Sequence, residues 1–199
     1  MTHETISLNT RQAMVTSLKK FMEKKPLSKI TVSEICKDCN INRKTFYYHF
    51  EDIYDLLRWM LDQEAFEVVK KFDLLKDNKE VTRFIIDYVD ANDHILCCAY
   101  DAMGREGMKR FFFSDFNGFI NTIIESIERA MDISIAPSYK QFLCDFYTNA
   151  MSGILIDWFS DRASRTKEEM IEYISVTVRT SLISAVCARA LSKTPKSNQ

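Results

Sequence analysis

The stretch from residue 27 to residue 59 constrains the fold more than any other part of the sequence, because it has the pattern of two short helices joined by a tight turn. Thr31 is followed three residues later by Glu34, a pair typical of the capping box that begins a helix. Asn40 suits the turn, since asparagine tolerates the left-handed backbone conformation that such a turn needs. Asn42 can then cap a second helix. The pattern therefore predicts a helix-turn-helix followed by the start of a longer helix.

The second of these helices has a basic and polar outer face. Arg43 and Lys44 open it, whereas Phe46 and Phe50, four residues apart, are expected to point back into the core. A short basic helix behind such a turn has the shape that enters the major groove of DNA. Arg43 and Lys44 can reach base edges or phosphates. The side chains expected to hold the DNA backbone are those of Thr45, Tyr47, Tyr48 and His49.

The spacing of these residues resembles the TetR family of one-component bacterial transcription regulators. Residues 30–57 follow the pattern I-T-V-x-x-I-x-x-x-x-x-I-x-x-x-T-F-Y-x-H-F-x-D-x-x-x-L-L. The resemblance implies that DNA is read by Asn42, Arg43, Lys44 and Thr45, that phosphates are contacted by Tyr47 and His49, and that Thr31 faces the DNA backbone. It also implies an all-α fold, with a helix-turn-helix DNA-binding domain at 1–58 and a helical effector-binding and dimerisation domain at 59–199.

The sequence departs from the family pattern at four positions within this stretch. Asn40 takes the place of the turn glycine, a change that the turn tolerates. Ile53 replaces the lysine that commonly follows the helix-start residue, which removes one phosphate contact. Cys36 and Cys39 stand where the family usually has alanines.

Turn-forming residues are scarce, which favours an all-α fold. Four glycines and three prolines among 199 residues leave little material for the turns of a β-sheet. The N-terminus lacks the basic start and apolar run of a signal peptide, and no stretch approaches the roughly 20 apolar residues of a membrane span. We therefore expect a cytoplasmic protein without a membrane partner.

The charge is distributed unevenly along the chain. Residues 1–50 hold nine Lys or Arg against four Asp or Glu, a net charge of +5, so the overall charge of −1 leaves −6 for the remainder. A basic DNA-facing module on an acidic body has this distribution. Taken without the helix-turn-helix pattern, a solvated lysine face is the alternative explanation of this basic segment.

Six cysteines raise the question of a metal or redox site. Cys36 and Cys39 form a C-x-x-C, but no second cysteine pair and no histidine pair stands at zinc spacing, so neither a metal nor a cofactor is expected. Small buried hydrophobic residues are the favoured interpretation. A redox role for Cys36, Cys39, Cys97 or Cys98 is the alternative, since reactivity depends on exposure and pKa.

The motifs of the common enzyme classes are missing. The sequence has no Gly-rich phosphate loop, no nucleophile elbow and no His-Glu-x-x-His. A di-metal helical bundle needs Glu-x-x-His pairs, and none of His3, His49 and His94 has a glutamate three residues before it. The chain is not expected to be an enzyme.

Apolar periodicity and helix-start signals predict helices along the whole chain. The expected helices cover 9–24, 52–72, 79–92 and 115–132, with short or broken helices at 94–113. Ser138 with Gln141, and Thr166 with Glu169, form two further capping boxes, which predict helices at 138–160 and 167–191.

These last two helices are expected to form a homodimer interface. They carry more apolar surface than one small body can bury, which suggests a two-fold four-helix contact, and the TetR resemblance implies the same. A larger monomeric core is the alternative. The segment 146–159 also resembles a TetR branch that includes regulators of dihydroxyacetone kinase operons.

The function expected from these features is sequence-specific transcription regulation, as a repressor, by a homodimer bound to a double-stranded DNA operator. The resemblance implies a small apolar effector in the body, or a protein co-regulator in the kinase-operon branch. A subunit that has lost DNA binding is a further alternative. Aromatic and Met residues of the body are candidates for an effector pocket, although such residues more often form core: Met60, Phe66, Tyr88, Tyr100, Met103, Phe112, Phe116 and Trp158.

Overall fold

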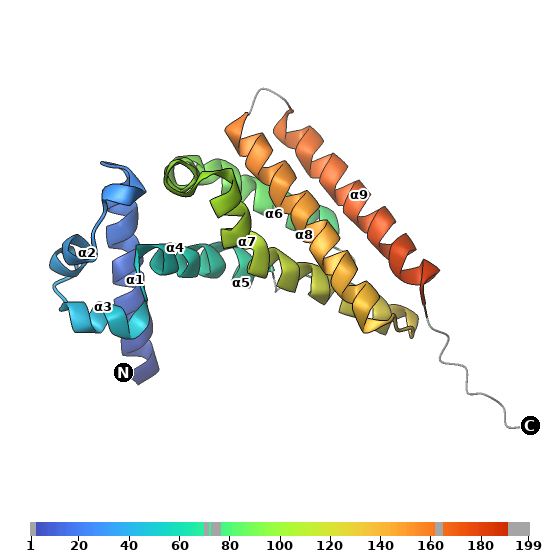
Figure 1. The fold of residues 1–199 in the computed structure, drawn as a ribbon, viewed down its shortest axis with the longest axis horizontal. Coiled ribbons are helices and arrows are strands. Elements are labelled where there is room, and N and C mark those ends of the chain that lie inside the picture. Colours follow the sequence, from blue (N-terminus) through green and yellow to red (C-terminus); the bar gives the residue numbers. More distant parts are fainter. Residues whose placement is uncertain (1–2, 70–71, 73–76, 162–164, 191–199) are drawn as a thin grey trace, which may run out of the picture. The chain divides into compact units, whose positions relative to one another are not determined.

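The computed structural model describes residues 3–69, 72, 77–161 and 165–190, and this part of the chain is built from α-helices without a β-strand (Figure 1). The all-α prediction is thereby confirmed. The chain divides into two compact units. One unit comprises Met1–Ala65 and Asn92–Met108, and the other comprises Phe66–Ala91 and Lys109–Gln199.

The first unit contains the predicted helix-turn-helix. Its helices are α1 (His3–Met22), α2 (Val32–Asp38), α3 (Arg43–His49), α4 (Ile53–Leu61) and the beginning of α7 (Asp93–Met131), with a 3-10 turn at Leu27–Lys29. Helix α1 packs against both α2 and α4. The core between them consists of Met14, Leu18, Ile35, Phe46, Leu56 and Leu57, all fully buried. A ring nitrogen of His94 on α7 donates to the carbonyl oxygen of Met22, 2.8 Å away, and so joins this part of α7 to α1.

Two helix boundaries in this unit differ from the sequence expectation. Helix α1 starts at His3 rather than at residue 9. The helix expected at 52–72 is present from Ile53 to Val69, but it is not one regular α-helix: α4 ends at Leu61 and continues through a π-helical segment, Asp62–Phe66, into the short α5, Glu67–Val69. Leu61 and Ala65, at the two ends of this transition, are both buried. Residues 70 and 71 of the expected helix lie outside the described residues.

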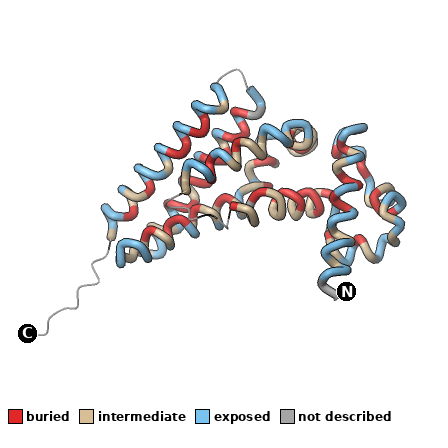
Figure 2. Tube along the Cα trace, turned by 180° about the vertical axis from the view of Figure 1, so that it is seen from behind, coloured by how far each residue is buried: buried red, intermediate tan, exposed pale blue. Residues whose placement is uncertain are grey.

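The second unit is a helical body made of α5, α6 (Asn78–Ala91), the rest of α7, α8 (Pro137–Ser160) and α9 (Lys167–Ala188). Helices α6 and α9 lie side by side, and Lys167 pairs with Asp87 at 2.7 Å. In Figure 2, buried and exposed residues alternate along α8 and α9, so each helix has an inner and an outer face. The inner faces pack into cores centred on Ile120, Ile124 and Val186 and on Ile86 and Trp158.

Helix α7 replaces the short helices expected at 94–113 and the separate helix expected at 115–132. It runs from Asp93 to Met131 with one kink, at Gly104, where φ is 66° and ψ is 176°. Only glycine adopts these angles without strain. The expected interruption is therefore confirmed at Gly104, but the division between 113 and 115 was wrong.

Of the two capping boxes predicted for the starts of α8 and α9, the first does not form and the second does. The expected box of Ser138 and Gln141 does not form: α8 begins at Pro137, without a side-chain cap. Proline suits the first helical position because its fixed φ matches the helix and its missing N–H needs no partner there. The box of Thr166 and Glu169 is confirmed at the start of α9. Helix α9 ends at Ala188, before the expected residue 191, which lies outside the described residues.

Among the described helices, α9 alone has the length and composition that a membrane span requires, with a mean hydropathy of 1.3 over its most apolar stretch. The sequence pattern predicted no such stretch. One third of that stretch is buried inside the fold, where Met170, Ile171 and Ile174 pack against residues of α6, α7 and α8. For a single helix that packs into the core in this way, length and composition are only weak evidence of a membrane span.

Candidate nucleic-acid interface

The turn between α2 and α3 is closed by backbone hydrogen bonds at the end of α2. The N–H of Ile41 donates to the carbonyl oxygen of Cys36 at 2.9 Å, and the N–H of Asn40 donates to that of Lys37 at 3.3 Å. These two bonds form a Schellman motif, which needs a left-handed residue. Asn40 is that residue, with φ at 52°, as the sequence predicted. The turn sets the direction in which α3 leaves α2.

Thr31 caps α2, and this role uses its polar groups. The carboxylate of Glu34 accepts from the hydroxyl of Thr31 at 2.8 Å and from its N–H at 3.0 Å, while the N–H of Glu34 donates back to the hydroxyl oxygen. Lys25 also donates to this carboxylate, at 2.6 Å. Together the lysine and Thr31 lower the pKa of Glu34 to about 2. Thr31 therefore reaches DNA only by exchanging its bond to Glu34 for one to a phosphate.

Asn42 caps α3, as predicted. Its side-chain oxygen accepts from the N–H of Thr45 at 2.8 Å and from the hydroxyl of Thr45 at 3.1 Å. The amide nitrogen of Asn42 has no hydrogen-bond partner in the described part of the chain, so it remains a free donor on an exposed residue. The cap thus leaves the amide N–H groups of Asn42 free and holds the hydroxyl of Thr45 in a hydrogen bond.

The outer face of α3 gathers the basic and aromatic side chains expected there. Lys44 is exposed and makes no ion pair with any described residue. The guanidinium of Arg43 donates to the hydroxyl of Tyr47 at 3.2 Å and lies 5.8 Å from the centre of its ring. Tyr47 and Tyr48 are 51% and 71% exposed. Phe46 is fully buried on the opposite side of the helix, so it anchors α3 with this face outward.

The end of α3 contacts α1 through His49, and the same residue of α1, Arg11, also contacts α4. The Nε of Arg11 donates to the Nδ1 of His49 at 3.4 Å, and the same guanidinium lies 5.7 Å from the centre of the Trp59 ring. Burial, and secondly the charge of Arg11, lower the pKa of His49. Sequence patterns could not predict this contact, because 38 residues separate Arg11 from His49.

The structure therefore brings together all the predicted DNA-contact residues of α3, from Asn42 to His49, on one helix whose aromatic anchors face the core. It adds Arg11 from α1 beside His49. Thr31 lies at the start of α2 with its hydroxyl already bonded. Ile53, which replaces the family lysine, is buried at the start of α4. These placements suit a surface that meets DNA through α3.

Cys36, Cys39 and Cys98 have the surroundings of structural rather than reactive thiols. Cys36 is buried and Cys39 is half-buried, and burial raises the pKa of both thiols. Burial likewise raises the pKa of Cys98. A raised pKa keeps a thiol protonated and lowers its reactivity. Within the described residues, no group of three or more His, Cys, Asp or Glu is arranged to hold a metal ion.

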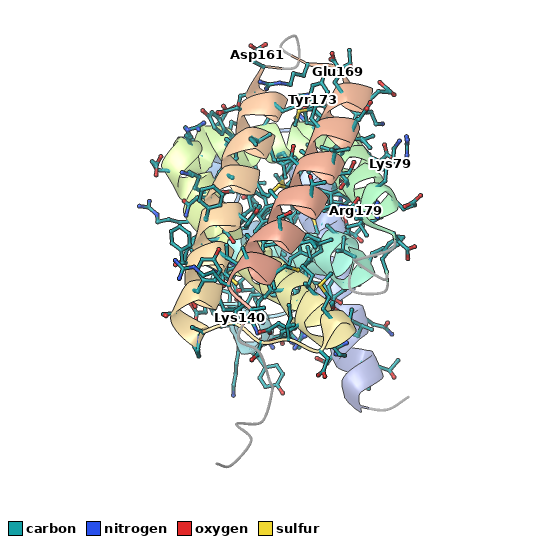
Figure 3. The ribbon with its side chains drawn as sticks, turned by 90° about the vertical axis from the view of Figure 1, so that its right-hand side faces the viewer. Lys79, Lys140, Asp161, Glu169, Tyr173 and Arg179 are labelled. Carbon is teal, nitrogen blue, oxygen red and sulfur yellow. The ribbon has the colours of Figure 1, made fainter. Side chains whose placement is uncertain are left out.

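An apolar cavity of about 40 Å³ lies inside the second unit, among α6, α7, α8 and α9. Aliphatic side chains line most of it, and Asn78, Thr82 and Arg179 supply its polar edge. Figure 3 shows Arg179 and Tyr173 along α9. None of the aromatic and Met candidates from the sequence lines this cavity, and the side chain of Phe66 lies outside the described part. Pockets for small organic ligands usually have volumes of about 300–1,000 Å³, so this cavity is closed to them as it stands.

The outer faces of α8 and α9 bound a second hollow, an open groove of about 530 Å³. Its walls include Phe146, Ile154 and Tyr173. Large apolar side chains are exposed along this surface, which we call the outer α8–α9 face: Phe142, Phe146, Ile154, Tyr173 and Val176. Exposed large apolar side chains gathered on two neighbouring helices are typical of an interaction surface.

Comparison with known proteins gives matches at both ends of the chain. Residues 19–60 match the family described as bacterial regulatory proteins of the tetR family, and residues 76–180 match the transcriptional regulator C-terminal region. The HTH-type dhaKLM operon transcriptional activator DhaS of Lactococcus lactis subsp. lactis (strain IL1403) is 21% identical over 148 residues, which cover 74% of this chain and 78% of that protein.

Two solved structures have a similar fold. The dihydroxyacetone kinase operon activator DhaS superposes with a TM-score of 0.54 at 18% identity, covering 90% of this chain and 94% of its own. A TetR-family regulator structure from Syntrophomonas wolfei str. Goettingen superposes with a TM-score of 0.59 at 21% identity, covering 88% and 95%. At these identities the structures support the fold alone.

Proposed function

The chain belongs to the TetR family of bacterial transcriptional regulators, and from this premise we propose that it controls transcription as a homodimer bound to a specific DNA operator. Proteins of this family are transcription regulators rather than enzymes. We assign DNA binding to residues 1–58 and effector binding and dimerisation to residues 59–199. Such a regulator works in the cytoplasm, where the DNA is.

The observation that carries this proposal is the outer face of α3. Lys44 is exposed without an ion-pair partner among the described residues, and Asn42 directs a free amide outward. Arg43 is held against Tyr47 but keeps further N–H groups to donate. A helix that carries such donors on one face and buried anchors on the other has the arrangement with which helix-turn-helix proteins enter a major groove.

The homodimer rests on the outer α8–α9 face. An exposed apolar face on two long neighbouring helices is covered most simply by the same face of a second copy, which gives a four-helix contact with two-fold symmetry. Two copies of α3 would then enter successive major grooves of a roughly palindromic operator.

The test compares variants of α3 with a matched control. Arg43→Ala and Lys44→Ala should each weaken binding to the chain's own upstream DNA by about tenfold or more, since a good side-chain contact to a base contributes about 1–3 kcal/mol. Lys79→Ala, which removes an exposed lysine at the start of α6, should leave the affinity unchanged. Unchanged affinity in both α3 variants, with intact folding, would reject the proposal.

A second candidate concerns what regulates the DNA binding. The cavity of about 40 Å³ has no room for a typical ligand, and the groove of about 530 Å³, which is large enough, is covered by the second copy in the proposed homodimer. This favours a protein co-regulator over a small-molecule effector. The Lactococcus relative is named as an activator of the dhaKLM operon. A thermal-shift screen of metabolites separates the two candidates: a ligand that raises the melting temperature supports the effector, and no shift together with a co-purifying protein supports the co-regulator.

The direction of regulation is part of the proposal as well. The resemblance implies repression, whereas the Lactococcus relative is named as an activator. A reporter fused to the upstream region decides between them. Higher expression after deletion of the chain supports repression, and lower expression supports activation.

A further inference from the structure

Three donor atoms of different kinds meet where the end of α1 lies against the beginning of α7. The Nε2 of His94 is 2.8 Å from the carbonyl oxygen of Met22. The Sγ of Cys98 is 3.8 Å from the same oxygen and 3.9 Å from that Nε2. His94 and Cys98 are four residues apart on α7, so their side chains lie on the same face of the helix. An imidazole nitrogen, a thiol sulfur and a carbonyl oxygen therefore form a compact triangle.

The carbonyl group of Met22 is available to α7 because of the residues that follow it. Its helical hydrogen bond would come from the N–H of residue 26, which is a proline and has none. The N–H of Lys25 donates to the carbonyl oxygen of Phe21 instead. The last carbonyl group of α1 therefore finds its partner outside the helix, at the ring of His94.

The triangle has nearly the dimensions of a zinc site. Zn²⁺ binds imidazole nitrogen and oxygen at about 2.0–2.2 Å and thiolate sulfur at about 2.3 Å, which at tetrahedral angles separates the ligand atoms by about 3.4–3.6 Å. The two separations that involve Cys98 exceed this by about 0.2–0.4 Å, and the one between His94 and Met22 is shorter by about 0.6 Å. His94 is exposed and Cys98 is half-buried, so both side chains have room for this adjustment.

We propose that His94, Cys98 and the carbonyl oxygen of Met22 bind one Zn²⁺ ion, with a water molecule at the fourth tetrahedral position. Nitrogen and sulfur ligands select an ion of this class over Mg²⁺ and Ca²⁺, which take oxygen ligands. The ion joins the end of α1 to the beginning of α7 within the first unit. This site depends neither on DNA nor on an effector, so it goes beyond the proposed function.

Sequence patterns cannot show a site of this kind. The expectation that the chain binds no metal rested on the spacing of cysteine and histidine pairs, whereas one ligand here is a backbone atom 72 residues away from His94. The described residues contribute only two side chains to it. It is therefore smaller than a cluster of three or more His, Cys, Asp or Glu, of which the described part of the chain has none.

Binding of the ion releases a proton. Burial, and secondly the charge of Asp101, raise the pKa of the Cys98 thiol, so the free thiol is protonated. The ion displaces this proton and forms a Zn–S bond, with one H⁺ released to solvent. His94 then binds as the neutral ring that carries its hydrogen on Nδ1, which leaves the lone pair of Nε2 for the ion. The negative charge of Asp101, three residues after Cys98, favours a cation at this place.

The experiment titrates the metal-free, reduced, full-length chain with Co²⁺, which takes the place of Zn²⁺ and is visible by absorption. One equivalent should produce the intense visible bands of tetrahedral Co²⁺ together with the near-ultraviolet charge-transfer band of a cobalt–thiolate bond. One equivalent of Zn²⁺ should then remove both. Zn²⁺ should also raise the melting temperature of the chain, because the ion binds the folded site.

Two conservative variants separate an ion site from a simple helix cap. His94→Gln keeps an N–H for the carbonyl oxygen of Met22 but lacks the ring nitrogen, and Cys98→Ser keeps a small polar side chain but lacks the thiolate. Each should weaken Co²⁺ binding by more than about a hundredfold, since even residues that only support a ligand contribute about 10–100-fold. Cys97→Ser, which removes the neighbouring thiol on α7, is the matched control and should bind Co²⁺ like the wild-type chain. Melts without metal check that every variant is folded.

The proposal would be overturned if one equivalent of Co²⁺ produced no tetrahedral and thiolate bands. Bands that survive in His94→Gln or in Cys98→Ser would place the ion on other residues and overturn it as well, as would bands that disappear in Cys97→Ser. None of these readouts involves DNA. A chain that fails to bind its operator can therefore still carry the ion site, and a chain without the site can still bind its operator.

Discussion

The N–H of Ile41 donates to the carbonyl oxygen of Cys36 over 2.9 Å, and this bond decides how α3 leaves α2. It requires the intervening Asn40 to be left-handed, with φ at 52°. Asparagine adopts this conformation at a lower cost than other residues with a Cβ, and glycine at a lower cost still. The presentation of the DNA-facing helix therefore depends on one turn residue that does not itself contact DNA in the proposed mode.

Substitutions at Asn40 should change stability in a fixed order. Asn40→Ala should lower the free energy of unfolding by about 1 kcal/mol, because alanine pays the full cost of the left-handed conformation. Asn40→Gly should keep or slightly raise it. Chemical denaturation of the two variants and the wild-type chain measures this order, and an alanine variant as stable as the glycine variant would contradict the assigned turn.

Acid should remove the contribution of Glu34 to stability. Its pKa falls from 4.5 to about 2 in the folded chain, so folding favours the ionised carboxylate. The stability gained is fully present above pH 4.5 and is lost as the pH falls towards 2. Glu34→Ala should therefore be less stable than the wild-type chain at neutral pH, with a difference that shrinks across this interval in thermal melts. A difference for Glu34→Ala that is constant with pH would contradict the pKa argument.

Replacing each of two glycines of α7 by alanine should change the stability of the chain in opposite directions. Gly104 has φ at 66°, so Gly104→Ala should lower stability by about 1–3 kcal/mol although open space surrounds its Cα. Gly118 stands in the regular part of the same helix with equally open surroundings, so Gly118→Ala should raise stability by about 0.5–1 kcal/mol. Denaturation midpoints measure both changes. A stabilising Gly104→Ala would show that the kink is not required.

Charges placed on the outer α8–α9 face should dissociate the proposed homodimer. In the proposed dimer, Phe146→Glu and Val176→Glu each bury a carboxylate in the interface, where it meets the same face of the second copy. Burying an unpaired carboxylate costs several kcal/mol. Sedimentation should then show the mass of a monomer. Ile6→Glu, at an equally exposed apolar position on α1, is the control that should leave the dimer intact. A wild-type monomer, or variants that remain dimeric, would contradict this interface.

Local signals in the sequence predicted the helix-turn-helix closely. Its main signals are the cap by Thr31, the left-handed Asn40 and the cap by Asn42. Each of them depends on residues close together in the sequence, so local patterns are sufficient to predict them. The buried pair Phe46 and Phe50 follows from helical spacing alone. The exposure of Arg43, Lys44, Tyr47 and Tyr48 on the other side of α3 was predictable for the same reason.

Predictions failed where neighbouring signals competed or where contacts were distant. Pro137 starts α8 before Ser138 can cap it, and either residue is a sound helix start on its own. The aromatic candidates whose side chains are described do not line the cavity, because helical periodicity does not show which residues leave a space between four helices. The contact of Arg11 with His49 depends on how α1 crosses α3, which no spacing along the chain records.

The measurement that tests the central claim most directly is binding of the purified chain to a duplex from its own upstream region, titrated at several salt concentrations against a scrambled competitor. Specific regulation predicts tight binding that the competitor does not displace, with affinity falling steeply as salt rises. Binding that the competitor abolishes, or no binding at any salt concentration, would contradict the assignment of this α3 face to an operator in that region.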